Sequence, residues 1–362
     1  MSTQSLGEGM RRRSLLRAAG LGGAAALGVS PGCLGRESGS GDTPPTPPPA
    51  LEDPPTAVYR PRSVAGMRLV GVADDGPFRF GLLYSLPSRF WELVGRTGYL
   101  REPAPEDSVH LMATVWDPET GVVLPEVGLT TEIRREDELV AEEAVYAMLS
   151  QRMGFHYGDN FALPGDGTYT VRVRVGGLQI RRTGAFAGRF GDPASVEIPF
   201  ELRAGDRAGI ERRALDDAGK EGAVEAMSVP EIPNAVTPPP ETLSGEHVGT
   251  VQTGDAVLDV LALSGGEAAR FDAETYLAVL VRTPYNGMVL PAMGLTATVD
   301  GTDHRLVRTA DPELGYHYGA AVAPVSSGTE LRLTTTTPPQ VARHEGYETA
   351  FVEMPTVTLT VA

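Results

Sequence analysis

Apolar and polar residues alternate over several short stretches of this chain, which is the pattern of a half-buried β-strand. In the segment 169–175, apolar residues occupy every second position (Tyr169, Val171, Val173, Val175) and polar residues lie between them. Successive side chains of a strand point to opposite faces, so such a segment has one apolar face. Further strands are expected at 109–116, 275–283, 294–299, 331–337 and 356–361. Many short strands with Gly, Pro and Asp turns predict an all-β fold of antiparallel sandwiches.

One block of sequence occurs twice. Gly154-Phe155-His156-Tyr157-Gly158 is matched by Gly315-Tyr316-His317-Tyr318-Gly319, and the strand-turn-strand at 109–130 is matched at 275–296. The offset is 166 in the strand-turn-strand (from 110 to 276) and 161 at the His-Tyr-Gly block (from 156 to 317). Two matching blocks that occur in the same order predict a duplicated domain. We therefore expect two sandwiches in tandem, at 59–203 and 245–362, that share one topology and pack against each other.

The segments between and before these domains differ in composition. Residues 204–244 are first charged and then Pro-rich, which predicts an interdomain linker with a short helix between Arg207 and Met227. Residues 34–58 contain Thr43-Pro44-Pro45-Thr46-Pro47-Pro48-Pro49. This composition predicts a disordered but stiff, extended spacer.

The N-terminal 33 residues are typical of an export signal. Arg12 and Arg13 precede Ser14-Leu15-Leu16, as in twin-Arg signals. The apolar stretch that follows is too short to span a membrane. It ends near Cys33, the only cysteine, for which we predict lipidation, the alternative being that Cys33 is removed with the signal. We therefore expect an exported protein, anchored by lipid on the outer face of the cytoplasmic membrane and without an intrachain disulfide.

The charge of the chain limits its partners. It contains 47 acidic and 31 basic residues, and Lys220 is the only lysine. A strongly acidic chain almost without lysine is typical of proteins adapted to high salt, in which net charge maintains solubility. A nucleic-acid-binding role is not expected, because it would need a basic patch.

Histidine and methionine residues are the best candidates for chemistry. Alternation places His110 and Met112 on one strand face, and His156 follows a segment that carries two methionines, Met148 and Met153. Imidazole and thioether groups form a soft, neutral ligand set that suits copper. Nearby carboxylates (Glu142, Glu143, Asp159) could add harder ligands for ferrous iron. The alternative is that the histidines are hydrogen-bonded interior residues and that His-Tyr-Gly is a structural corner.

The first domain resembles the periplasmic iron- and copper-binding proteins that accompany bacterial high-affinity ferrous-iron uptake permeases. Three blocks carry the resemblance: Asp107-Ser108-Val109-His110-Leu111, the segment from Met148 to His156-Tyr157-Gly158-Asp159-Asn160, and Gly167-Thr168-Tyr169-Thr170-Val171. The resemblance covers about residues 59–202, with the second repeat a more distant copy in what looks like a haloarchaeal-type exported lipoprotein. It implies an immunoglobulin-like sandwich, usually dimeric, that binds copper through His and Met and transfers iron to a permease.

The ligands of this family carry over only in part. Its two first histidines fall on His110 and His156, and its methionine falls on Met148, with Met153 as an alternative. The family's Glu is replaced by Met112, and its last His, in a Gly-Arg-His segment, meets Phe190.

The second repeat has lost more of these ligands. Tyr276 and Thr309 stand at the positions of His110 and Met148, while His317 is retained and His344 lies nearby. We expect this repeat to act as a structural pseudo-dimer partner that completes or covers the first site.

Two functions follow from these observations, and a third is not expected. The first is a membrane-anchored extracytoplasmic metal-binding protein that assists iron or copper uptake, with a permease as a possible partner. The second is an interaction or structural lipoprotein of the cell envelope that binds no metal. An enzyme is not expected, because no acid–base or nucleophile set accompanies the candidate ligands.

Overall fold

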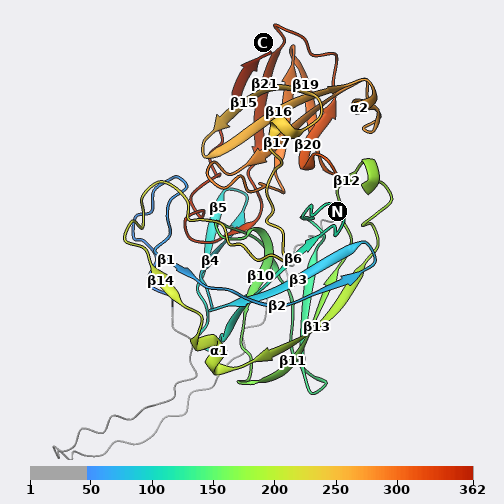
Figure 1. The fold of residues 1–362 in the computed structure, drawn as a ribbon. Coiled ribbons are helices and arrows are strands. Elements are labelled where there is room, and N and C mark those ends of the chain that lie inside the picture. Colours follow the sequence, from blue (N-terminus) through green and yellow to red (C-terminus); the bar gives the residue numbers. More distant parts are fainter. Residues whose placement is uncertain (1–46, 362) are drawn as a thin grey trace, which may run out of the picture. The chain divides into compact units, whose positions relative to one another are not determined.

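The computed structural model describes residues 47–361, which lie within one compact unit. Arg12, Arg13, Cys33 and the first part of the predicted spacer lie outside the described residues. Strands account for nearly all of the regular structure (Figure 1), which confirms the all-β prediction. The helices are single short turns: α1 (Ala204–Ala208), α2 (Gly266–Ala269), and the 3-10 turns η1 (Gly184–Phe186) and η2 (Pro240–Thr242).

The first half of the fold, residues 59–203, forms most of two sheets. The larger has eight strands in the order β2 (Arg68–Asp75), β3 (Phe78–Ser85), β6 (Val109–Trp116), β10 (Gly154–Phe161), β9 (Tyr146–Ser150), β22 (Ala342–Arg343), β4 (Phe90–Val94) and β5 (Thr97–Arg101). The smaller has four, in the order β13 (Ala194–Leu202), β11 (Gly167–Val175), β7 (Leu129–Arg135) and β8 (Glu138–Ala144). The two sheets approach each other most closely where β13 meets β2.

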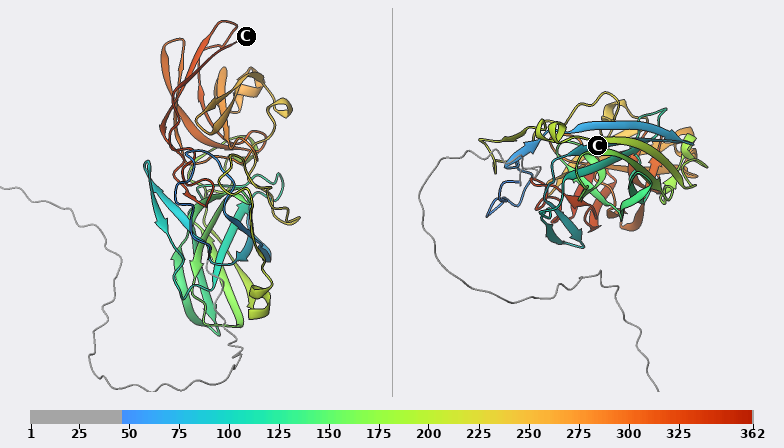
Figure 2. Two further views of the ribbon diagram at one scale, coloured as in Figure 1. Left: turned by 90° about the vertical axis from the view of Figure 1, so that its left-hand side faces the viewer. Right: turned by 90° about the horizontal axis from the view of Figure 1, so that it is seen from below.

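The second half, residues 245–361, forms one continuous sheet. Its order is β15 (Glu246–Thr253), β16 (Ala256–Ser264), β17 (Thr275–Arg282), β20 (Gly315–Ala321), β19 (Thr302–Asp311), β18 (Gly294–Val299), β21 (Glu330–Thr337) and β23 (Val357–Thr360), with β12 (Arg181–Arg182) joined to β19. The sheet curves until its outer strands β15 and β23 meet (Figure 2). The long strand β19 pairs with both β20 and β18, whereas the first half divides the corresponding segment into β8 and β9.

Strand pairing around the His-Tyr-Gly block is the same in both halves. Tyr157 lies opposite Ala113 in the β10–β6 pair, and Tyr318 lies opposite Val279 in the β20–β17 pair. These partners are separated by the offsets of 161 and 166 that the sequence shows. The predicted alternation is also present, since Tyr169, Val171 and Val173 of β11 are buried.

Each half also supplies a short strand to the sheet of the other. β22, from the second half, runs parallel to β9, with Ala342 opposite Met148. β12, from the first half, runs parallel to β19, with Arg181 opposite Thr309. One cluster of buried apolar side chains includes residues from both halves. The consequence for function is that a residue following β22 can reach a site built on β6, β9 and β10.

The predicted spacer and linker pack against the fold more than their composition suggested. Within the predicted spacer, Val58 is buried and Pro55 accepts a hydrogen bond from the Thr349 hydroxyl. Within the predicted linker, β14 (Arg212–Ala214) pairs with β1 (Ser63–Ala65), and the helix ends at Ala208. The helix prediction was therefore largely wrong, because strand pairing and the burial of Leu215 and Val224 against Val64 compete with a weak helical pattern.

Gln151 fixes the relative positions of four segments that surround the end of β9. Its Nε2 donates to the carbonyl oxygens of Tyr59 (2.7 Å) and Gly346 (3.2 Å), and its Oε1 accepts from the backbone of Val224 (2.8 Å). Its own carbonyl accepts from the Asn286 side chain at 2.9 Å. A buried amide with its polar atoms satisfied favours one arrangement of these segments.

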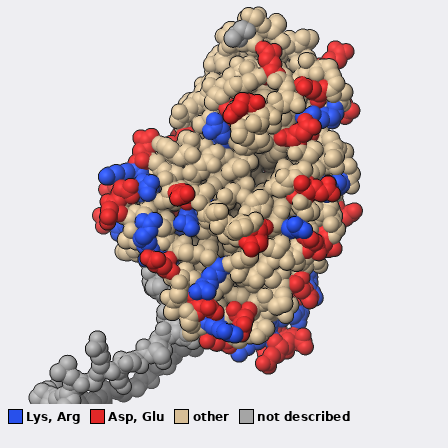
Figure 3. Space-filling view, viewed as in Figure 1, with Lys and Arg blue, Asp and Glu red and all other residues tan. Residues whose placement is uncertain are grey.

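Acidic and basic side chains are interspersed on the face shown in Figure 3. Within residues 47–361, no helix combines the length and the apolar character that crossing a bilayer requires.

Candidate metal centre

His110 lies on β6 and is almost completely buried. Its Nδ1 is 2.9 Å from the Oδ1 of Asn160, the residue opposite it on β10. The Asn160 amide is itself held by the backbone of Ser88, which donates to Oδ1 at 3.0 Å and accepts from Nδ2 at 2.8 Å. Because Oδ1 is an acceptor, Nδ1 carries the proton and Nε2 presents a lone pair, as in imidazoles that bind metals.

His156 lies on β10 and is oriented by its own backbone. Its Nδ1 donates to the carbonyl oxygen of Gly154 at 3.0 Å. Gly154 has a φ of 67°, a left-handed conformation that favours glycine. Strand pairing places His156 directly opposite Met148 of β9. The Nε2 of His156 therefore also presents a lone pair, from the strand next to β6.

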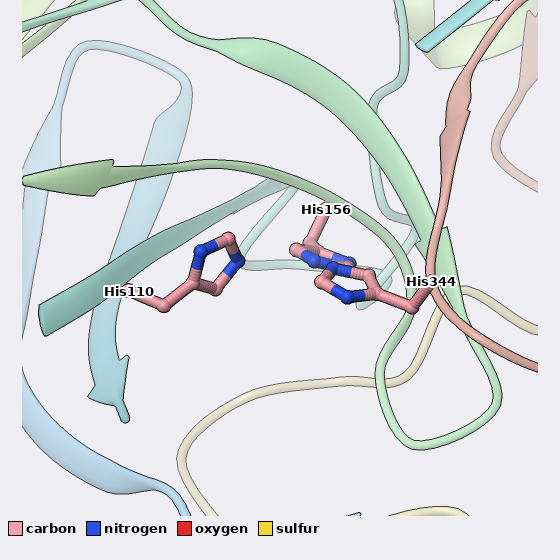
Figure 4. Close-up of side chains that lie close together, drawn as sticks. All are labelled: His110, His156 and His344. Atoms are coloured by element: carbon pink, nitrogen blue, oxygen red, sulfur yellow. The ribbon is translucent and has the colours of Figure 1, made fainter. Parts of the chain in front are cut away.

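His344 comes from the second half and immediately follows β22. Its backbone N–H donates to Leu149 of β9 at 3.0 Å, which continues the parallel pairing. Its ring stacks on that of His156 at 5.5 Å and meets that of His110 edge-on at 5.3 Å. One ring nitrogen from each histidine lies within 4.8 Å of the other two. Figure 4 shows the three rings converging from separate elements.

Two of the converging histidines have a ring nitrogen without a protein partner. The Nε2 atoms of His110 and His156 are buried without a hydrogen bond. Burial lowers the pKa of His110 to about 4 and that of His156 to about 3, and burial beside the other two imidazoles holds the pKa of His344 well below its ordinary value. These rings are therefore neutral at pH 7. Unpaired lone pairs at the meeting point of neutral imidazoles fit a metal ion, because such an ion would satisfy them.

Met148 lies opposite His156 and close to His110. A Cβ atom placed on Gly158 would lie 3.3 Å from the Sδ of Met148 and 3.2 Å from the Nε2 of His110. Both atoms therefore border the same small space, which exists because residue 158 has no side chain. Met153 lines the cavity beside the histidines and packs into the apolar core. The sequence left open which methionine is the ligand, and the geometry favours Met148.

The carboxylates considered from the sequence do not join the histidines. Glu142 and Glu143 are exposed on β8, which belongs to the four-stranded sheet, whereas the histidines lie on or beside the eight-stranded sheet. Among residues 47–361, the cluster of candidate metal ligands contains only the three histidines and no acid, so Asp159 does not belong to it either. The harder ligand set for ferrous iron is therefore wrong.

The corresponding position in the second half contains no such cluster. His317 donates from Nδ1 to Gly315 at 3.2 Å, as His156 does to Gly154, but its Nε2 lies 3.1 Å from the Tyr276 hydroxyl. Burial raises the pKa of Tyr276 to about 12, so this hydroxyl keeps its proton. Tyr276 stacks on Phe271 at 3.9 Å between ring centroids. This position is occupied by the protein's own side chains.

His344 is not among the ligands that the sequence predicted. Phe190, which the resemblance sets against the last histidine of the similar proteins, is buried in the core against Phe78 and Phe186. The available signal was His344 itself, a histidine of the second repeat. Its place beside His110 and His156 follows from the parallel pairing of β22 with β9, which the sequence pattern does not show.

Comparisons with known proteins give limited matches. Residues 241–360 match the model of a family described as a domain of unknown function, DUF7350. None of the curated proteins matches the chain. The structure is weakly similar to FetP from uropathogenic Escherichia coli strain F11 in its "as isolated" form, with a TM-score of 0.30 and 20% identity over 38% of this chain and 97% of FetP. For a copper-bound FetP variant the TM-score is 0.30 with 18% identity, over 38% of this chain and 92% of that one.

Proposed function

We propose that this protein binds one copper ion as cargo through the Nε2 atoms of His110 and His156, a ring nitrogen of His344 and the thioether of Met148. The observation that carries the proposal is the pair of buried, unpartnered Nε2 atoms that face a third imidazole. Metal–imidazole bonds of about 2.0–2.1 Å place two ligating nitrogens roughly 3–4 Å apart. One ring nitrogen of each histidine already lies within 4.8 Å of the other two, which is close to that spacing.

Copper, and Cu(I) in particular, fits these residues better than a hard cation. Three imidazoles and one thioether are uncharged nitrogen and sulfur ligands that suit copper, whereas magnesium and calcium favour oxygen ligands. A buried site without a carboxylate does not neutralise its ion, so a monovalent ion costs less to desolvate than a divalent one. Iron remains the alternative cargo named by the family resemblance.

The residues around the ligands would hold them ready for the ion. Asn160 and the Gly154 carbonyl fix the Nδ1–H tautomer of His110 and His156, so both Nε2 atoms can bind metal without prior proton transfer. The low pKa values keep the rings unprotonated in mildly acidic surroundings. Binding and release, rather than a chemical reaction, is the role we assign.

We further propose that the protein acts outside the cytoplasm, attached by lipid at Cys33, and assists metal uptake by a permease. This part of the proposal rests on the twin-Arg signal, the position of Cys33 and the Pro-rich segment. The two halves would act as a pseudo-dimer within one chain. The reciprocal pairing of β12 and β22 and the position of His344 support this arrangement.

The test is an anaerobic Cu(I) titration of the exported protein, in competition with a chromophoric chelator. Wild-type protein should bind one Cu(I) per chain. His344→Ala should weaken binding by more than the roughly 10–100-fold that loss of an outer hydrogen-bond partner of a ligand costs. The matched control is His247→Ala, an exposed histidine that should leave binding unchanged. Wild-type protein that binds neither Cu(I), Cu(II) nor Fe(II) would support the envelope interaction protein instead.

A further inference from the structure

A cavity lies directly beside the histidine cluster and is bordered by three arginines. It has a volume of about 130 Å³, and its lining includes His110, His156 and His344 together with Arg89, Arg152 and Arg212. An apolar protein cavity of about 150 Å³ accommodates a molecule as large as benzene. The space can therefore hold a small organic ion and not only water.

Two of these arginines have hydrogen-bonding capacity that the protein does not use. The Nε atoms of Arg152 and Arg212 are buried without a partner, and neither guanidinium forms an ion pair with another residue in the described part of the chain. Arg212 makes one hydrogen bond, from a terminal nitrogen to the Pro87 carbonyl at 3.1 Å. Burial lowers the pKa of both groups, and the Arg89 guanidinium contributes to the effect on Arg212.

Basic side chains outnumber acidic ones in the lining of the cavity. Arg89 is neutralised by Glu102, at 2.8 Å, and also donates to the Pro48 carbonyl at 2.7 Å. Glu345 is the acidic residue of the lining, and its Oε1 is buried without a hydrogen bond. Glu225 attracts Arg152 and Glu345 attracts Arg212, but neither carboxylate forms a close ion pair with these guanidiniums.

We propose that this cavity binds a small carboxylate anion between Arg152, Arg212 and the metal position. Guanidinium and carboxylate groups match each other in planar geometry, and their charge-assisted hydrogen bonds are strong. The remaining lining includes Met112, Met153 and Val224, which suit a short hydrocarbon body better than a fully hydrated inorganic anion. The anion's second oxygen would face the three histidines.

This anion site deepens the proposed metal-binding function and rests on it for its role. An oxygen ligand from the carboxylate would favour a harder, more highly charged ion such as Cu(II) over Cu(I). The cavity would then act as a selectivity device in which the bound anion sets which oxidation state is retained. Anion binding itself depends on the arginines alone and can be measured without metal.

The first experiment measures malonate binding to the metal-free protein by calorimetry. Wild-type protein should show saturable binding, and Arg152→Gln and Arg212→Gln should each weaken it at least about tenfold, the size of one lost charge-assisted hydrogen bond. Arg174→Gln is the matched control, an arginine on β11 of the other sheet that pairs with Glu132, and should not change binding. Near-ultraviolet circular dichroism checks that each variant is folded, and Arg152→Lys and Arg212→Lys, which keep the charge, should retain part of the binding.

The second experiment titrates Cu(II) with and without malonate and follows the visible absorption band. A band shift and tighter binding with malonate in wild type, both absent in Arg152→Gln, are expected. If copper does not bind but malonate does, the metal proposal fails while the anion site stands. If wild-type protein binds no malonate, prefers inorganic phosphate, or responds to Arg174→Gln as it does to Arg152→Gln, the carboxylate site is overturned.

Discussion

The two halves place a histidine at the same corner of the same strand arrangement, but the spaces around these histidines differ. His156 and His317 both donate from Nδ1 to the carbonyl of the glycine two residues earlier. A Cβ on Gly158 would approach His110 and Met148 at 3.2–3.3 Å, whereas a Cβ on Gly319 would collide with the Tyr276 hydroxyl. The same backbone geometry therefore surrounds open space in one half and a filled core in the other.

A few side chains account for this difference. Tyr276, Thr309 and Ala321 occupy the pairing positions that His110, Met148 and Asn160 occupy in the first half. The strand received from the other half ends before Thr183, which bonds to Asp311 at 2.7 Å, where the first half receives His344. Strand pairing fixes where the candidate ligands stand, and a small number of substitutions decides whether that place can hold an ion.

The largest effect is expected from removing one imidazole of the first site. His156→Ala should abolish stoichiometric Cu(I) binding, because it deletes a central ligand that no neighbouring group replaces. The competition titration measures it. His317→Ala is the matched control and should leave one Cu(I) per chain. Equal losses of Cu(I) binding in both variants would contradict the placement of the metal site in the first half.

The converse experiment converts the second position into a copy of the first. Combining Thr183→His, Tyr276→His and Thr309→Met supplies the missing ligands. Adding Ala321→Asn supplies the hydrogen-bond acceptor for the new imidazole at position 276. We expect the stoichiometry to rise from one to two Cu(I) ions. The same protein without Thr183→His is the control, and an unchanged stoichiometry in the full combination would contradict this explanation.

A smaller effect is expected from the residue that orients His110. Asn160→Ala removes the acceptor of the Nδ1 proton and should weaken Cu(I) binding about 10–100-fold. Asn160→Asp keeps an oxygen at that position and should stay much closer to wild type. Identical affinities for Asn160→Ala and wild type would argue against a role for this hydrogen bond.

The buried histidine of the second half should affect stability through pH. Burial lowers the pKa of His317 to about 4, whereas an exposed histidine has a pKa of about 6.5. Between these values the unfolded chain binds a proton that the folded chain does not, so stability falls as pH decreases, by about 1.4 kcal/mol per pH unit for one group. Urea unfolding of metal-free protein at pH 7, 6 and 5 should give a shallower pH dependence for His317→Gln than for wild type. The same pH dependence of the unfolding free energy in both proteins would contradict the lowered pKa of His317.

The smallest effect is expected from Tyr276, which fills the space beside His317 in the second half. Tyr276→Phe leaves the Nε2 of His317 buried without its partner and should cost about 1–3 kcal/mol of unfolding free energy. Copper binding should not change, because the first position is untouched. Tyr285→Phe, at a half-exposed residue, is the control for both measurements. A loss of copper binding in Tyr276→Phe would mean that a change beside His317 alters the site at His110 and His156.

The sequence was informative where local patterns decide the structure. Alternation predicted the buried face of β11, and the repeated block predicted the matching registers around His156 and His317. It also supplied His110 and His156 as candidates. It did not predict that His344 joins them, because the parallel pairing of β22 with β9 connects residues almost two hundred positions apart. Long-range pairing of a two-residue strand leaves no periodic signal for a sequence-based argument.

The packing of residues 47–58 and 204–244 escaped prediction for a related reason. Their composition is typical of connecting segments, yet Thr349 binds Pro55, Gln151 binds Val224, and β14 adds a strand to β1. Such contacts depend on which surfaces the completed domains present, and composition does not contain that information.

The exchange of β22 also makes the three-histidine cluster depend on both halves of the chain. His344 lies 188 residues after His156, so the third imidazole reaches the cluster only once the second half has been synthesised and β22 has paired with β9. A chain in which the second half is missing or misfolded would carry His110 and His156 without the complete cluster. Loading of an ion there would therefore report that the two halves have folded together.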